Sequence, residues 1–247
     1  MSYECFAESY DRLTGNVDYA GMAAFLRDII IRNKPDCSLV LDMACGTGSL
    51  AIELQKLGFD MTAADGSYEM LSCAMSKGAQ GILFLRQRME KLDMYGTMGA
   101  IVCTLDSVNH VTEPDTLAEI FRRAAMFLDD DGVFIFDANT PYKHREILAD
   151  NTFVYDLDDL YCVWQNETID ELLTAISLDF FTLDEETGLY DRSGESFCER
   201  AYSDEQLCDM LEKAGLSVTE RYDDYADAAP CDTTQRIVYV CRRSFKH

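Results

Sequence analysis

The sequence predicts an α/β fold in which helices cover both faces of a doubly wound, Rossmann-like sheet. Strand-like and helix-like segments alternate five times over roughly the first 140 residues. The strand-like segments are nearly continuous apolar runs, as expected for parallel strands that are buried on both faces. After about residue 150 the alternation gives way to strand-like segments joined by short turns, which predicts an antiparallel insert.

The first part of the chain has two predicted helices and then a regular strand–helix alternation. Pro35 ends the second helix, because a residue that precedes proline avoids helical geometry. Gly58 is a natural stop for the helix after the first strand, and Ser67 is a good N-cap for the next one. The acidic run 129–132 is predicted to be a turn. We expect helices over 3–13, 17–33, 49–56, 67–77 and 114–127, and strands over 38–42, 60–64, 82–85, 100–104 and 133–136.

The second part of the chain is predicted to complete the sheet after an interruption. Ser203 and Gln206 form a capping pattern at the start of a helix over 203–214. The predicted strands lie near 153–155, 160–165, 173–181, 189–199, 218–225 and 236–241. Residues 1–149 and 201–247 are therefore expected to form one α/β domain, and residues 150–200 an antiparallel β insert that is not an independent domain.

The charge balance excludes some classes of partner. The chain has 45 acidic and 21 basic residues, a net charge of −24, which disfavours binding to nucleic acid or to an anionic membrane surface. The ten cysteines include no C-x-x-C pair, and the chain opens without a signal-peptide pattern. No cluster has the spacing of a zinc site. We expect a cytoplasmic protein with reduced thiols, no membrane span and no metal.

The segment 39–51 carries the most specific chemical signal. An apolar strand ends in Asp42, a turn of small residues follows, and a helix opens at Ser49. Gly46 and Gly48 lack a Cβ atom, so the backbone can turn sharply and let a ligand come close. The free N–H groups at the helix start favour electronegative ligand atoms. These features indicate a nucleotide-type site, although Ala44 stands where a dinucleotide-binding loop has its first glycine.

The run Leu-Asp-Met-Ala-Cys-Gly-Thr-Gly (41–48) resembles motif I of the class I S-adenosylmethionine (SAM)-dependent methyltransferases, in the form common among small bacterial members. The layout resembles that family over nearly the whole chain and most specifically over 39–138. The resemblance implies a sheet that finishes in antiparallel strands, SAM as cofactor and S-adenosylhomocysteine as product. It also assigns cofactor contacts to Asp42, Ala44, Cys45, Gly46 and Gly48.

Two further segments are expected to contact the cofactor. Asp65 ends the second strand, where a carboxylate can accept hydrogen bonds from both ribose hydroxyls; NAD-binding folds use the same device. The resemblance assigns Asp65 to the SAM ribose, and the adjoining Gly66 is also expected to bind the cofactor. Met89 and Glu90 follow the third strand, where family members contact adenine. Arg88 occupies the position where those members often have an acid, so adenine is recognised by the backbone, by Glu90 or by nothing specific.

The candidate catalytic residues are Asp106, His110 and Tyr10. Asp106 and His110 follow the fourth strand, near the switch point where ligands bind in open α/β sheets. The resemblance places Asp106 near the SAM methionine or methyl group, and Tyr10 in a segment that relatives fold over SAM. His110 also fits a structural role at a helix start, and Tyr10 also fits core packing.

The predicted function is SAM-dependent methyl transfer to a small-molecule acceptor. The sulfonium makes the methyl group electrophilic, so alignment and exclusion of water are the main requirements. Aromatic and cationic residues of the insert, such as Trp164 and Arg200, suit an acceptor pocket or a homodimer interface. Two alternatives stay open: a SAM-binding sensor or scaffold without turnover, and an NAD(P)-linked oxidoreductase.

Overall fold

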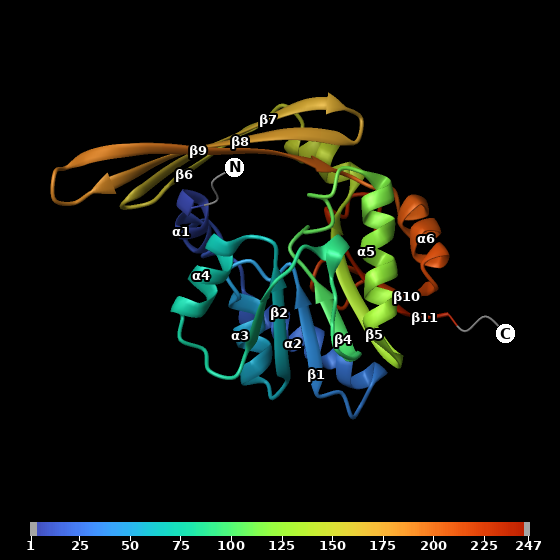
Figure 1. Ribbon diagram of the computed structural model, residues 1–247. Helices are drawn as coiled ribbons and strands as arrows, with labels where there is room; N and C mark the ends of the chain where they lie inside the picture. Colours follow the sequence, from blue (N-terminus) through green and yellow to red (C-terminus); the bar gives the residue numbers. More distant parts are fainter. Residues whose placement is uncertain (1–3, 245–247) are drawn as a thin grey trace.

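The computed structural model describes residues 4–244 and contains two sheets, shown in Figure 1. The larger sheet has the order β10-β11-β5-β4-β1-β2-β3, and the smaller one the order β6-β7-β8-β9. The strands of the larger sheet are β1 (Leu39–Met43), β2 (Asp60–Asp65), β3 (Leu83–Arg86), β4 (Met98–Cys103), β5 (Leu128–Asn139), β10 (Leu216–Asp223) and β11 (Arg236–Arg243). Those of the smaller sheet are β6 (Thr152–Asp156), β7 (Leu160–Asp170), β8 (Leu173–Asp184) and β9 (Leu189–Arg200).

The larger sheet has the predicted doubly wound topology. Strands β1 to β5 are parallel, and β1 lies between β2 and β4. Strands β10 and β11 add an antiparallel edge next to β5, which confirms the predicted antiparallel finish. The helices are α1 (Glu4–Leu13), α2 (Tyr19–Asn33), α3 (Ser49–Lys56), α4 (Tyr68–Ser76), α5 (Pro114–Phe127) and α6 (Asp204–Lys213), with short turns η1 (Met89–Lys91) and η2 (Lys143–Leu148).

Apolar cores fill both faces of the larger sheet. On one face, Leu26 of α2 and Leu54 of α3 pack against the sheet. On the other face, Phe121 of α5 and Leu211 of α6 do so. This two-sided burial explains why the central strands are apolar at successive positions rather than alternating. No helix among residues 4–244 has the length and apolar character needed to cross a membrane.

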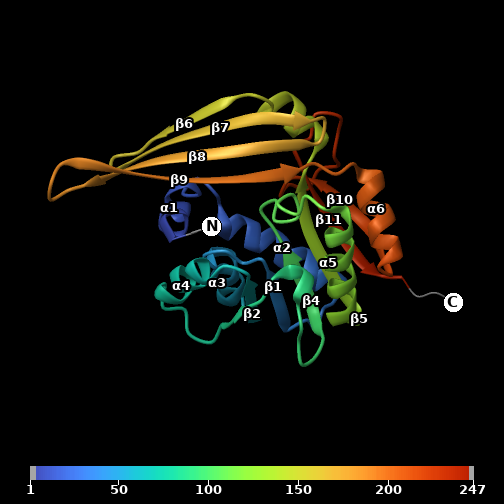
Figure 2. The same cartoon turned by 45° about the horizontal axis from the view of Figure 1, so that its top comes forward.

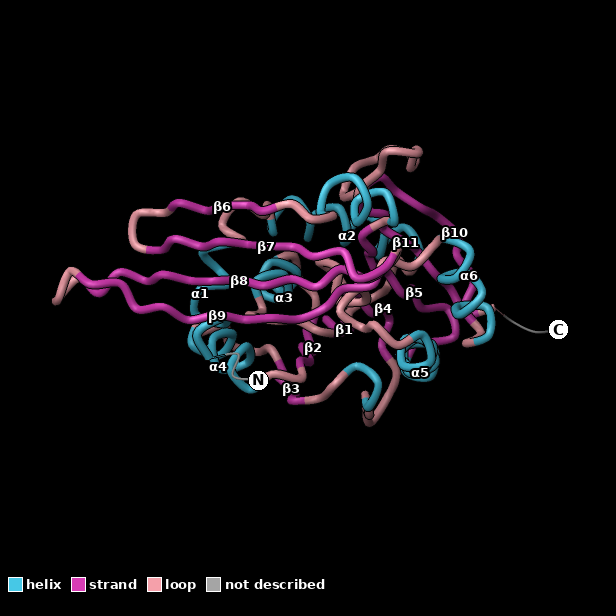
Figure 3. Tube along the Cα trace, turned by 90° about the horizontal axis from the view of Figure 1, so that it is seen from above, coloured by secondary structure: helices cyan, strands magenta, loops and turns pink. Residues whose placement is uncertain are grey.

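The smaller sheet lies across the end of the larger one at which its parallel strands terminate (Figures 1 and 2). Seen from above, its four strands run side by side over α1, α3 and the strand ends (Figure 3). Its own core includes Ile176 and Phe180, and Leu13 of α1 packs against it. The antiparallel sheet predicted for the insert is therefore present, with α1 between it and the larger sheet.

Two local predictions differ from the structure. The acidic run 129–132 is not a turn but an irregular part of β5, which begins at Leu128. Leu128 pairs with Met98 and Val133 with Ala100 of β4, so the acidic run lies between two paired positions. Lys34 neutralises this run, with its Nζ 2.6 Å from Asp131 and 3.6 Å from Asp129. The second difference is η2, a π-helical turn after β5 that the sequence pattern does not indicate. The predicted start of the first helix at residue 3 lies outside the described residues.

Candidate active site

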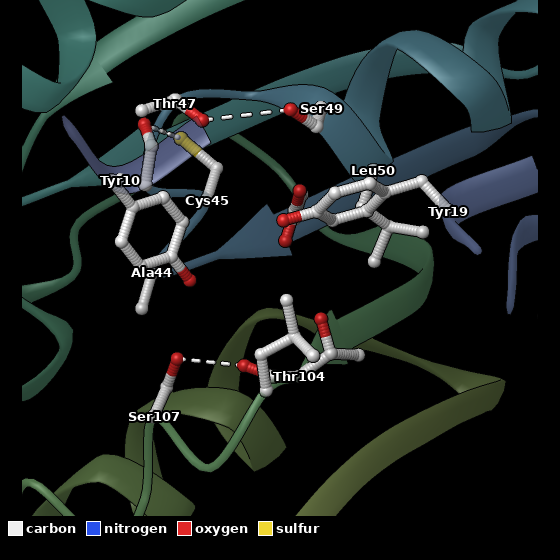
Figure 4. Close-up of a pocket in the computed structure, with 12 residues that line it drawn as sticks. Tyr10, Tyr19, Ala44, Cys45, Thr47, Ser49, Leu50, Thr104 and Ser107 are labelled. Atoms are coloured by element: carbon white, nitrogen blue, oxygen red, sulfur yellow. Dashed lines mark hydrogen bonds between the residues drawn. The ribbon is translucent and has the colours of Figure 1, made fainter. Parts of the chain in front are cut away.

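A cleft opens at the carboxyl ends of β1 and β4. It holds about 340 Å³ of empty space, its open mouth included. Tyr10 and Tyr19 face this space from opposite sides, and the loop that carries Thr104 and Ser107 lies across from the glycine turn (Figure 4). The lining residues come from α1, α2, β1, the glycine turn, the start of α3 and the loop after β4: Tyr10, Tyr19, Asp42, Ala44, Cys45, Gly46, Thr47, Ser49, Leu50, Thr104, Leu105 and Ser107.

The glycine turn shapes the floor of the cleft. Gly46 has φ +52°, and a Cβ atom added there would meet nothing within 4 Å, so this face is open to a ligand. Gly48 has a different role, because an added Cβ would lie 3.0 Å from the Ala74 Cβ and 3.3 Å from the Phe84 ring. Gly48 thus allows the start of α3 to pack closely on α4 and β3. Ala44 also has a positive φ, +64°, which costs energy for a residue with a side chain.

Asp42 is the buried acid of the cleft. Its side chain is 1% exposed, and its Oδ2 has no hydrogen-bond partner among the described residues. Burial, together with the nearby Asp65 carboxylate, raises the pKa of Asp42 to about 7. A buried carboxylate without a partner is costly, and a cationic group of a ligand in the cleft would satisfy it.

We expect Asp42→Asn to stabilise the ligand-free protein increasingly as the pH rises. An unfolded chain ionises this carboxyl near pH 4, whereas the folded protein ionises it near pH 7. Between these values the folded state holds more protons, so the stability of the parent protein falls as the pH rises. If half of the pKa shift is counted, the free energy of unfolding of the variant should exceed that of the parent by about 2 kcal/mol at pH 8. Melting curves from pH 4 to 8 measure this, with exposed Asp60→Asn as control; parallel curves would contradict it.

Asp65 ties the glycine turn to the end of β2. Its Oδ2 accepts a hydrogen bond from the Gly46 N–H at 2.9 Å, and its Oδ1 accepts one from the Ser67 N–H at 2.8 Å. Burial raises the pKa of Asp65, against the lowering effect of these N–H donors. Each carboxylate oxygen can accept a further hydrogen bond, so this geometry leaves room for ligand hydroxyls.

The other predicted cofactor residues lie beyond the cleft wall, along the ends of β2 and β3. A Cβ added at Gly66 would be 3.1 Å from the Arg88 Cγ, so glycine permits this close approach. The Arg88 Nε pairs with the Glu90 carboxylate at 2.7 Å. Met89 packs against the core, with its sulfur 3.7 Å from the Cys103 Sγ. Arg88 stands where family members often have an acid, and here an acid, Glu90, follows two residues later.

The loop after β4 has an unusual backbone that Asp137 holds in place. Leu105 and Asp106 both have φ +54°, a conformation that side chains disfavour. Their two N–H groups donate to the Asp137 carboxylate at 2.7 and 2.6 Å. The Tyr225 hydroxyl donates to the same carboxylate. These contacts hold the strained segment in place and set where Asp106 points.

Arg236, the first residue of β11, neutralises the two acids. Its guanidinium lies 2.6 Å from the Asp106 Oδ1, and its Nε is 3.9 Å from the Asp137 Oδ1. Burial by itself would raise the pKa of Asp106, but Arg236 and Lys143 bring it below its usual range. Asp106 is therefore an ionised anchor in this geometry. Neither Arg236 nor Tyr225 was expected from sequence, where no motif surrounds them.

A second group of ionisable side chains joins the insert to this loop. Glu199 of β9 is 3% exposed, and its Oε1 lies 3.6 Å from the His110 Nε2. Its Oε2 is 3.9 Å from the Nε2 of His144, which belongs to η2. Burial lowers the pKa of both histidines, that of His144 to about 4. Asp106, His110 and Glu199 each offer a ligand atom within 4.8 Å of the others, but Asp106 is already paired with Arg236.

Helix α1 covers the cleft. Tyr10 reaches into it, and burial raises the pKa of this hydroxyl well above its usual value, so Tyr10 stays protonated. The Asp11 carboxylate accepts a hydrogen bond from the Thr47 hydroxyl at 2.5 Å and pairs with the Lys77 Nζ at 2.7 Å. Both contacts fasten α1 beside the glycine turn.

Comparison with known proteins gives the family. Residues 40–132 match the family model for a methyltransferase domain. The chain is 31% identical to YqeM, a methyltransferase-family protein of Bacillus subtilis (strain 168), over 99% of this chain and 98% of that protein. The chain belongs to the SAM-dependent methyltransferases. A SAM-dependent methyltransferase from Clostridium acetobutylicum ATCC 824 has the same fold, with a TM-score of 0.89 and 33% identity over 98% of this chain and 99% of that one.

A further relative of this methyltransferase matches only in part. The glycine/sarcosine N-methyltransferase of Halorhodospira halochloris is 34% identical over 143 residues, which cover 53% of this chain and 51% of that protein. The NAD(P)-linked alternative is set aside by this membership.

Proposed function

We propose that this methyltransferase transfers the methyl group of SAM to a small-molecule acceptor held between the loop after β4 and the insert. The observation that carries this is the close approach of the insert to that loop, with Glu199 3.6 Å from His110. The Arg200 N–H also donates to the Asn109 carbonyl at 2.8 Å. In this proposal residues 1–149 and 201–247 hold the cofactor, and residues 150–200 cover the acceptor.

The cleft fits SAM on grounds of charge and space. Asp42 offers a buried, unpartnered carboxylate oxygen to the cationic part of the cofactor. Gly46 leaves open space beside it. We assign Ala44 and Cys45 to the same wall, Asp65 to the ribose hydroxyls, and Gly48, Gly66, Met89 and Glu90 to the approach along the strand ends. When bound, SAM supplies a methyl group on a positively charged sulfur, which makes that carbon electrophilic.

The chain's own residues then have to orient the acceptor and exclude water. Tyr10 covers the cleft as a protonated hydroxyl, and Arg236 fixes the ionised Asp106 beside it. His110 lies at the partly exposed edge of the same space, with a side chain 45% exposed, where it can pass a proton to solvent. The glycine and sarcosine substrates named for the Halorhodospira relative support a small acceptor here too.

The deciding experiment measures S-adenosylhomocysteine formation with a library of small metabolites, and with tRNA and duplex DNA in parallel. We expect turnover with members of the library and none with either nucleic acid, because the chain carries a net charge of −24. Turnover with tRNA or DNA alone would contradict the proposal. Binding of SAM without turnover on any acceptor would favour the sensor alternative.

Asp65→Ala should weaken SAM binding by about 1.5–3 kcal/mol, the range for hydrogen bonds to a charged group. The physical reason is the loss of a carboxylate that serves the ribose and also ties Gly46 to β2. Calorimetric titration with SAM measures the dissociation constant. Asp60→Ala, at the exposed opposite end of the same strand, is the control. An unchanged constant for the Asp65 variant would remove that residue from the site.

A further inference from the structure

We propose that the acceptor of the methyl group is an amine, which binds as its ammonium ion against Glu199 and gives a proton to that carboxylate before transfer. This inference rests on the proposed function and adds the chemical class of the acceptor. It also gives a role to the insert, since Glu199 belongs to β9 and no pattern in the sequence distinguishes it from the other acids of that strand.

The Glu199 carboxylate is hydrogen-bonded by the Asn139 side chain, and two histidine rings lie near it without bonding it. The His110 Nε2 at 3.6 Å and the His144 Nε2 at 3.9 Å are both beyond good hydrogen-bond distance. The His144 side chain is 2% exposed, and its Nε2 has no hydrogen-bond partner among the described residues. Its Nδ1 lies 3.0 Å from the Thr174 hydroxyl, which fixes the ring with Nε2 toward Glu199. Two imidazole Nε2 atoms thus face one buried carboxylate, and that of His144 is left without a hydrogen-bond partner among the described residues.

The charges around this space call for one positive charge. Three carboxylates meet there, from Asp106, Asp137 and Glu199, against two cations, Arg236 and Lys143. Burial and the Asp106 charge raise the pKa of Glu199 to about 8, so this carboxyl is mostly protonated at neutral pH. A monocation would replace that proton and leave no excess of positive or negative charge. A divalent metal would exceed the balance, and an anionic acceptor would increase the negative charge.

The proton and electron movements are balanced. The ammonium N–H bond breaks, its proton goes to the Glu199 carboxylate, and the electron pair stays on nitrogen. That lone pair forms a bond to the methyl carbon, while the pair of the methyl–sulfur bond stays on sulfur and leaves S-adenosylhomocysteine. The product nitrogen carries the positive charge that sulfur had. Glu199 returns its proton to solvent past His110, whose side chain is 45% exposed.

The first test follows the ionisation of Glu199 directly and needs no turnover. The protein is labelled with ¹³C at glutamate carboxyl groups and titrated by NMR with S-adenosylhomocysteine bound; Glu199→Gln identifies the signal. Saturating methylammonium chloride should lower the apparent pKa of Glu199 by at least one unit, because a cation stabilises the ionised form. Methanol and acetate should not. No effect of methylammonium, or an effect of magnesium chloride alone, would overturn the inference.

The second test uses kinetics on the metabolite library, arranged as amines and the alcohols or acids of the same carbon skeleton. Amines should be methylated preferentially. Glu199→Gln should lower kcat/KM for the best amine at least 100-fold at pH 7, and Glu199→Asp should restore part of it. The dissociation constant of SAM should stay the same. Glu195→Gln is the matched control, a buried glutamate four residues earlier on β9.

The outcomes separate the two levels of the proposal. If no small molecule is methylated, the proposed function fails. If alcohols or acids are methylated and amines are not, or if Glu199→Gln keeps the parent rate on amines, the proposed function stands and the amine inference fails.

Discussion

Replacing Arg236 by methionine is expected to lower the free energy of unfolding by about 3–5 kcal/mol, the cost of removing one partner from a buried ion pair. Arg236 lies 2.6 Å from the partly buried Asp106 and 3.9 Å from the fully buried Asp137. Without the Arg236 guanidinium, those carboxylates must take up protons or keep negative charges that no cation balances. Urea unfolding followed by circular dichroism measures the loss.

The control for this loss is Arg192→Met, on the insert. Arg192 pairs with Asp179 at 2.8 Å, but its side chain is 65% exposed, so its removal should cost less than about 1 kcal/mol. Adding Asp106→Asn to the Arg236 variant should recover part of the stability, because one uncompensated charge is then gone. Equal losses for both arginines, or no recovery in the double variant, would contradict the assigned role of Arg236.

Gly46→Val is expected to weaken SAM binding at least ~100-fold, or about 3 kcal/mol. A β-branched side chain at φ +52° is strained, and its Cβ would enter the open space of the cleft. Calorimetry with SAM on the folded variant gives the dissociation constant, after circular dichroism has shown the parent spectrum.

Gly215→Val separates backbone strain from loss of the site. Gly215 has φ +83° and open space around it, and it lies past the end of α6, which does not line the cleft. We expect a comparable loss of stability and an unchanged affinity for SAM. Parent affinity in a folded Gly46→Val protein would show that the glycine turn does not contact the cofactor.

The sequence predicted the larger sheet well because its signals are local. Apolar strands, glycine stops and the Ser203 capping box each act within a few residues, and the structure confirms that cap. The acid that ends β1 and the loop after β4 were also placed at one cleft, because carboxyl ends of parallel strands share an edge.

The remaining parts of the site depend on long-range contacts, which no local pattern encodes. Arg236 is 130 residues from Asp106 along the chain. Glu199 is one of many acids in an acidic sequence, and only the path of β9 brings it to His110. The same limit explains the wrong turn at 129–132, since Lys34, which neutralises that run, is 97 residues from Asp131.

Helix α1 contacts both halves of the proposed site. We therefore expect one movement of α1 to control the entry of both the cofactor and the acceptor. Its Asp11 is bonded to Thr47 of the cofactor cleft, while its Arg12 pairs with Asp159 of the insert at 3.0 Å. The Arg12 pair is 44% and 41% exposed, which makes it inexpensive to break. We expect detachment of this helix to uncover both proposed compartments together, and its return to close both. Release of spent cofactor and release of methylated product are then expected to belong to the same step of the catalytic cycle.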